Sequence, residues 1–195
     1  MKWIDKKEYY ENIARDVTPA STLMVKEGVF WTIVAYIQSA ATLGIKKPHA
    51  ILSDSAAALG PIQAFPRSFG ILYPEEIVHE ARHTLQMEIC GWVIPVLGWF
   101  FGRKVRAWCG LPLFLILNLL PLPILVNYGR FRLELDAEST AWRVGLKDGW
   151  LTPKEIKARA ALFGRSMFML DYFFAWPWAK GTAARKADKI INEGI

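Results

Sequence analysis

The sequence of 195 residues is poor in cysteine and histidine and has no long run of basic residues. Its two cysteines, Cys90 and Cys109, do not form a C-x-x-C pair. This spacing disfavours a zinc knuckle or a dithiol redox motif and favours free thiols in a reducing compartment. Lys and Arg outnumber Asp and Glu, 24 to 18, but they are scattered in twos and threes. Because no long basic run is interleaved with aromatic residues, nucleic acid is not a predicted partner.

The first residues, MKWIDKKEYYENIARD, are charged and polar and lack the apolar core of a signal peptide. The chain also lacks internal repeats, low-complexity segments and a clear linker. Its length suffices for one domain with a hydrophobic core but would make two full domains small. We therefore expect a single domain over residues 1–195 that carries no secretion signal.

Apolar residues make up 53% of the chain, which is high for a domain of this size. The longest uncharged run, 107–129, has 23 residues, a length that permits a membrane span. Pro112, Pro121 and Pro123 disfavour one continuous helix there. We therefore predict an apolar helical insertion over about 91–129, which forms either a re-entrant or interfacial hairpin or a pair of buried helices.

Hydrophobic periodicity and the positions of Gly and Pro predict a mainly helical α+β fold with a small sheet. Helices are expected over 4–16, 28–45, 75–91, 130–145, from Thr152 to about 163, and over the polar tail 182–195. Another helix is expected to begin at Thr18-Pro19. Short strands are expected at 49–52, HAIL, and at 69–73, FGILY. The second strand is expected to run along the helix of 75–91.

The most specific feature is the run His79-Glu80-Ala81-Arg82-His83, because it contains two of the three histidines of the chain. On a helix, side chains four residues apart lie on one face, so both imidazoles can reach one zinc ion. Glu80 is rotated about a quarter turn away, where its carboxylate can take a proton from a water at the metal. The motif therefore predicts His79 and His83 as zinc ligands and Glu80 as the general base.

A catalytic zinc site needs a third protein ligand and leaves one position open. Glu134 and Glu138, within the predicted helix RFRLELDAESTAW, are four residues apart and share one face. The remaining histidine, His49, has no comparable context. A group that stabilises a tetrahedral oxyanion is also expected beside the metal. The candidates for this role are Tyr128, Tyr172, His49 and Arg132.

The combination of H-E-x-x-H with a downstream helix bearing E-x-x-A, and an acid four residues after the first Glu, resembles the gluzincin branch of the zincin metallopeptidases. The resemblance implies a zinc-dependent peptidase in which Glu134 is the third ligand. It implies that Glu138 orients a histidine ligand from outside the coordination sphere. The usual residue at that second position is Asp, so an exchange of roles between the two glutamates stays open.

Further features are similar to a poorly characterised zincin-like group from bacteria and their phages. They include Gln86, the apolar Pro-rich stretch before YGRFRLELDAES, and an aromatic segment Y…WPW near the end of the chain. The stretch SFGILYP resembles the edge strand that holds substrate in zincins. The resemblance covers roughly residues 60–180 and implies a zincin-like domain with a peptide or protein substrate.

Three hypotheses about function follow from these features. The first is a zinc metalloendopeptidase. The second is a membrane-associated form of the same enzyme, motivated by the uncharged run 107–129. The third is a structural or assembly protein, for example a virion component, that retains a zincin fold. Without a signal peptide, the expected location is the cytoplasm or a virion, with association to a membrane surface left open.

Overall fold

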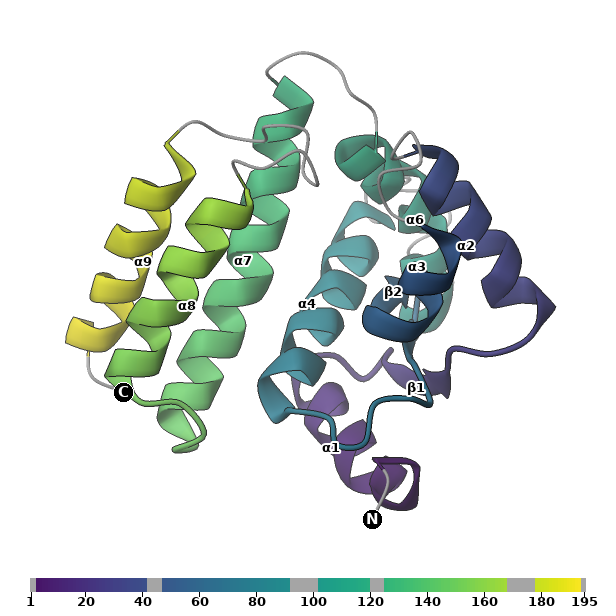
Figure 1. The fold of residues 1–195 in the computed structure, drawn as a ribbon, viewed down its shortest axis with the longest axis horizontal. Coiled ribbons are helices and arrows are strands. Elements are labelled where there is room, and N and C mark those ends of the chain that lie inside the picture. Colours follow the sequence, from purple (N-terminus) through teal and green to yellow (C-terminus); the bar gives the residue numbers. More distant parts are fainter. Residues whose placement is uncertain (1–2, 42–46, 92–101, 120–124, 168–177, 194–195) are drawn as a thin grey trace. The chain divides into compact units, whose positions relative to one another are not determined.

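The computed structural model describes residues 3–41, 47–91, 102–119, 125–167 and 178–193 (Figure 1). These residues form a mainly helical α+β fold with a three-stranded sheet, as predicted. In chain order, the elements are η1 (Trp3–Lys6), α1 (Lys7–Val17), β1 (Thr22–Val25), α2 (Val29–Ala41), α3 (Pro48–Asp54), β2 (Ala57–Leu59), β3 (Ile62–Phe65), α4 (Pro74–Gly91), α6 (Arg103–Leu119), α7 (Leu125–Lys147), α8 (Pro153–Ser166) and α9 (Ala179–Glu193).

The elements fall into two compact units. The first unit comprises Met1–Tyr73 and Glu80–Phe114, and the second comprises Pro74–His79 and Leu115–Ile195. Helix α4 contributes residues to both units. This division therefore does not decide whether the chain folds as one domain, and that expectation stays a prediction.

The sheet of the first unit has the order β1-β3-β2, with β3 parallel to β1 and antiparallel to β2. Strand β3 is central, and its Gln63, Ala64 and Phe65 are fully buried. Gly60, with φ 58°, begins the two-residue turn that joins β2 to β3. A tight hairpin requires this positive φ, which glycine adopts without steric cost.

The predicted strand at 69–73 is wrong, because these residues form an irregular connection that leads into α4. Of its apolar residues, Ile71 and Tyr73 are exposed and only Leu72 is buried. The carbonyl of Gly70 accepts a hydrogen bond from the backbone N–H of Trp3, at 2.9 Å, instead of a strand partner. The segment thus has the residue types of a strand without a neighbouring strand to pair with.

The predicted strand at 49–52 is also wrong, because these residues lie in α3. Pro48 occupies the first helical position after the extended residue Lys47, a strong helix-start signal. The buried ammonium of Lys26 then satisfies carbonyls at the end of this helix, at 2.7 Å from Ile51 O and 3.1 Å from Ser55 O. The proline at the start of the helix and the Lys26 hydrogen bonds at its end therefore outweigh the preference of the apolar residues at 49–52 for a strand.

The prediction that a helix begins at Thr18-Pro19 is wrong. Thr18 is the extended residue that ends α1, and β1 follows at Thr22. The Thr18 hydroxyl donates to the Glu88 carboxylate at 3.0 Å, and both side chains are buried. This contact to α4 fixes Thr18 in an extended conformation at the end of α1.

Glu88 holds α4 to α6 within the first unit. Its Oε1 accepts hydrogen bonds from Arg103 Nε at 2.7 Å and Arg106 Nη2 at 3.0 Å. The two helices also approach closely at glycine: a Cβ on Gly110 would lie 1.7 Å from the backbone oxygen of Met87. Partly buried ion pairs and a crossing that only glycine permits therefore determine where α6 lies against α4.

The apolar insertion predicted over 91–129 is described only in part. Pro112 lies inside α6, which continues past it to Leu119, and α7 begins at Leu125. The exposed position of Pro112 allows water to satisfy the carbonyl that lacks an N–H partner. Pro121 and Pro123 fall outside the described residues. Among the helices that are described, none has the length and apolar character needed to cross a membrane, and contact of this segment with a membrane stays a prediction.

The second unit is built on the neighbouring helices α7, α8 and α9 (Figure 1). Its core contains Phe131, Trp142, Ile156, Phe163 and Ile190 among other apolar residues. Helix α8 begins as predicted at Thr152-Pro153. The Thr152 side chain accepts from the Glu155 backbone N–H, and the Glu155 carboxylate accepts from the Thr152 backbone N–H.

We expect Glu88 to make the stability of the protein dependent on acid pH. Burial raises the pKa of Glu88, but hydrogen bonds from Arg103, Arg106 and Thr18 outweigh it and leave the pKa lowered. The contribution of the carboxylate is therefore complete above its unfolded-state pKa of about 4.5 and is lost as pH falls through the lower folded-state value. Urea unfolding at pH 7 should show Glu88→Gln to be less stable by about 3 kcal/mol. Its stability should also change less with pH below 5, and equal acid sensitivity of the two proteins would contradict this role.

Gly164 should be required for the contact between α8 and α9. A Cβ at this position would lie 2.5 Å from the Lys180 Cα, so we expect Gly164→Ala to lower the free energy of unfolding by about 1–3 kcal/mol. At Gly181 of α9, a Cβ would make only an ordinary 3.8 Å contact with Arg185. Gly181→Ala should therefore raise the free energy of unfolding by about 0.5–1 kcal/mol. Equal stabilisation by both substitutions in urea titrations would rule out the close approach.

Candidate metal centre

Helix α4 carries the predicted motif, and its buried polar side chains include Glu75, His83, Gln86 and Glu88. The helix begins at Pro74 with carboxylates in its first turn, which the helix dipole favours. Within the second unit, the Glu75 carboxylate accepts a hydrogen bond from Arg159 of α8 at 2.5 Å. The buried side chain of Glu75 thereby attaches the first turn of α4 to the second unit.

The two predicted acids of α7 approach different nitrogens of His79. Glu134 Oε2 lies 3.5 Å from His79 Nε2, and Glu138 Oε1 lies 3.6 Å from His79 Nδ1. The three side chains are partly buried. Glu134 is thus on the Nε2 side of the ring, where it could share a metal ion with Nε2. Glu138 is on the opposite side, where a small movement would let it accept a hydrogen bond from Nδ1–H.

His83 follows one turn later on α4 and has a partner of its own. Its Nδ1 lies 2.9 Å from Gln86 Oε1, and its buried ring packs edge-on against Phe114. Because a side-chain amide oxygen only accepts hydrogen bonds, this contact places the ring proton on Nδ1. The Nε2 of His83 then carries the lone pair that can bind a metal ion.

The ligand atoms of His79, His83 and Glu134 lie within 4.8 Å of one another. Bonds of about 2.0–2.1 Å to one zinc ion would require separations between ligand atoms on the order of 3–4 Å. Small side-chain movements therefore suffice to close the group around an ion. Metal-ligating histidines usually direct their second nitrogen at a carboxylate or carbonyl oxygen, as Glu138 and Gln86 allow here. The residues present fit a divalent metal with an affinity for imidazole.

Glu80 is partly buried and follows His79, so it is rotated roughly 100° around α4 from that ligand. Within the described part of the chain, no hydrogen bond or ion pair engages its carboxylate. Its position thus agrees with the predicted rotation away from the metal-binding face. The carboxylate is available to a water or substrate at the site.

The role of each candidate for the oxyanion group stays a prediction. Tyr128 precedes Glu134 by six residues on α7, is partly exposed, and its ring lies 6.4 Å from that of Phe131. Arg132 is exposed and lines a groove against α9. His49 is exposed on α3. Tyr172 lies outside the described residues, and its role stays a prediction.

The sequence interpretation did not assign a role to Gln86, which the structure places against His83. The signal was present in the spacing, because a residue three positions after His83 lies on the same side of the helix. A Gln there can accept a hydrogen bond from the Nδ1–H of the histidine, whereas an apolar residue cannot. The same spacing rule identified Glu138 from Glu134.

Comparison with protein-family models, with curated proteins and with solved structures finds no significant match to this chain.

The outer acceptors should control metal affinity without being ligands. We expect Gln86→Leu and Glu138→Leu each to weaken zinc binding by about 10–100-fold, because each histidine loses the acceptor that fixes its ring. Glu134→Ala should weaken it further, since a ligand is removed. Asp148→Asn is the control, because it also removes one negative charge but at an exposed residue in the turn after α7. It should have no effect on zinc affinity. Competition titration against a zinc-binding dye measures each affinity. A larger loss for Glu138→Leu than for Glu134→Ala would show that the two acids exchange roles.

Proposed function

We propose that this protein is a zinc-dependent metallopeptidase with a zincin-like domain. The observation that carries the proposal is the arrangement of the His79, His83 and Glu134 ligand atoms, with Glu138 and Gln86 on the far sides of the two imidazoles. This arrangement combines a metal-binding set with the groups that orient it. It also agrees with the resemblance of the sequence motif to the gluzincins.

The type of donor favours a catalytic over a structural zinc site. Two imidazoles and one carboxylate form a set found in catalytic zinc sites, which leave one position open to water or substrate. Structural sites are usually closed by cysteine. Here burial raises the pKa of the Cys90 thiol, and this disfavours the thiolate needed for ligation.

The chain itself supplies the groups for peptide hydrolysis. Zinc, when bound, lowers the pKa of a coordinated water towards about 7 and polarises a carbonyl group. His79, His83 and Glu134 would hold the ion. Glu80 would accept the proton of the attacking water and deliver it to the leaving amine, as a general base and then a general acid. The substrate would be a peptide or protein.

A second candidate is a structural or assembly protein that retains a zincin-like site. Helix α2 favours it, because Val29, Tyr36 and Ile37 are 78%, 62% and 60% exposed on a helix without charged residues. Exposed apolar surface of this kind is common where a partner binds. A protein with this role could bind zinc, but it would not cleave peptides.

Substitution of Glu80 separates the two candidates. Glu80→Gln should keep the zinc content of the wild type and lower peptide cleavage by about 10²–10⁴-fold, because the amide cannot accept a proton. His79→Ala should lose zinc and activity together. Cleavage of a peptide library is measured with and without a chelator, beside zinc analysis of each protein. If the wild type with full zinc occupancy shows no chelator-sensitive cleavage, the peptidase proposal is wrong and the assembly role is favoured.

A further inference from the structure

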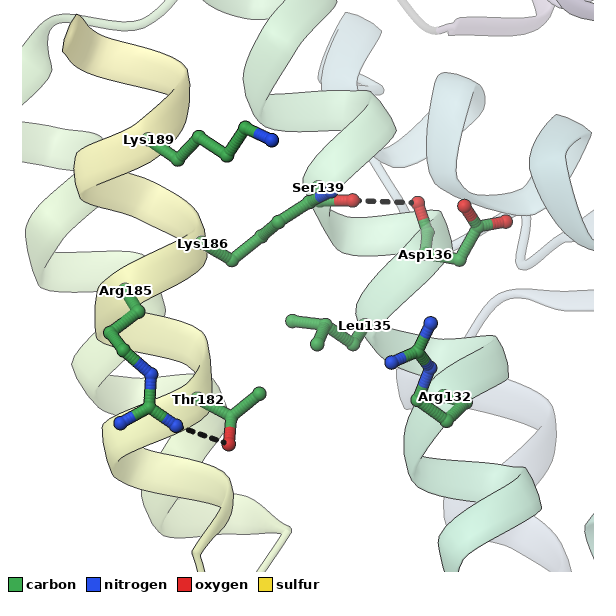
Figure 2. Close-up of a pocket in the computed structure, with 8 residues that line it drawn as sticks. All are labelled: Arg132, Leu135, Asp136, Ser139, Thr182, Arg185, Lys186 and Lys189. Atoms are coloured by element: carbon green, nitrogen blue, oxygen red, sulfur yellow. Dashed lines mark hydrogen bonds between the residues drawn. The ribbon is translucent and has the colours of Figure 1, made fainter.

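A groove of about 270 Å³ lies between α7 and α9 within the second unit. Figure 2 shows its lining side chains, which come from facing sides of the two helices. The lining residues are Arg132, Leu135, Asp136, Ser139, Thr182, Arg185, Lys186 and Lys189. Leu135 and Ser139 are buried and form the base, while the cationic residues are at least partly exposed.

The groove carries four cationic side chains and one carboxylate. The groove cations of α9 are spaced so that they share one face of the helix, whereas Ala183, Ala187 and Ile190 point into the core of the unit. Packing of that apolar face therefore places Arg185, Lys186 and Lys189 in the groove. The cationic character is thus set by which face of α9 is buried.

Most of these cations lack an acidic partner that would neutralise the groove. Among the described residues, no carboxylate lies within ion-pair distance of Arg132 or Lys186, while Lys189 makes only an exposed pair with Glu193 at 3.5 Å. In contrast, Lys157 of α8 pairs with Asp188 at 3.3 Å on another side of α9. With four cations and only the Asp136 carboxylate, the groove holds an excess of positive charge. The like charges repel one another, and a bound anion would relieve this repulsion.

The groove also offers one neutral hydrogen-bond donor, the Thr182 hydroxyl. Arg185 Nη2 donates to Thr182 Oγ1 at 3.4 Å, a bond that does not use the Thr182 hydroxyl hydrogen. Guanidinium, ammonium and hydroxyl groups together suit the several acceptor oxygens of a phosphoryl group. The volume is slightly below the roughly 300–1,000 Å³ of typical ligand pockets, so a small ligand fits better than an extended chain.

We propose that this groove binds a small anion bearing phosphoryl groups. The site is distinct from the metal centre, because the groove residues of α7 lie on another side of that helix from the two metal-site acids. At about 100° per residue, Arg132 is rotated roughly 160° from Glu134, and Ser139 roughly 140°. The inference goes beyond the proposed peptidase activity and does not depend on it.

Inorganic pyrophosphate is a suitable probe, titrated into the full-length protein by isothermal calorimetry. The titration uses the His79→Ala chain, so that a metal ion at the other site cannot bind the anion. We expect saturable binding at one site that weakens as salt is added. Arg132→Gln and Lys186→Gln should each reduce affinity about tenfold, as expected for loss of one charge-assisted hydrogen bond.

Lys154→Gln is the matched control, because it removes one exposed positive charge from α8 outside the groove. It should bind pyrophosphate as the parent does. Circular dichroism melts of all variants should coincide, since the substituted side chains lie at the surface. An equal loss of affinity in Lys154→Gln would overturn the proposal, as would the absence of saturable binding. The groove could instead bind a single-stranded oligonucleotide or anionic vesicles through Arg132 and Lys186 but not bind pyrophosphate. That result would overturn the proposal of a small ligand and indicate a surface for a macromolecule or a membrane.

Discussion

Buried polar side chains of helix α4 impose the main constraint on this protein. A carboxylate or imidazole taken out of water costs several kcal/mol unless it gains a partner. The chain meets this requirement for Glu75 with Arg159, for His83 with Gln86, and for Glu88 with two arginines and a threonine. The contacts of Glu75 and Glu88 also determine which element lies beside the first and the last turns of α4, whereas the His83–Gln86 contact lies within the helix.

The same constraint explains why the histidines are suited to bind a metal. A hydrogen bond donated by Nδ1–H to an acceptor keeps the proton of a neutral imidazole on Nδ1, so that Nε2 can act as the ligand. Glu138 and Gln86 provide an acceptor on that side of the two rings. Gln86 therefore sets the tautomer of His83 without binding the ion. Glu138 Oε1, at 3.6 Å from His79 Nδ1, would have to move closer to do the same for His79.

Helix α7 supports two kinds of chemistry on different sides. Glu134 and Glu138 face the histidine of α4, whereas Arg132 and Ser139 line the groove against α9. A helical repeat of 3.6 residues makes this possible, because neighbours in sequence point in different directions. The two metal-site acids are thus kept apart from Arg132, although only one residue separates Arg132 from Glu134 in the chain.

Much of the centre could be predicted from the sequence, since the positions within α4 and α7 depend on local helical spacing. The spacing of His79 and His83 required only that 74–91 be helical, which it is. The strands at 49–52 and 69–73 were mispredicted because a strand depends on a partner distant in sequence. The close approach of Gly164 to α9 likewise depends on tertiary packing, which no local pattern encodes.

X-ray absorption at the zinc edge of the purified full-length chain tests the central claim most directly. Our account predicts one zinc per chain with nitrogen and oxygen ligands at about 2.0–2.1 Å, two of them imidazoles. It also predicts no sulfur in the coordination sphere. A sulfur shell at about 2.3 Å, implicating Cys90 or Cys109, would contradict the assignment of His79, His83 and Glu134, as would a fully folded protein that binds no stoichiometric zinc.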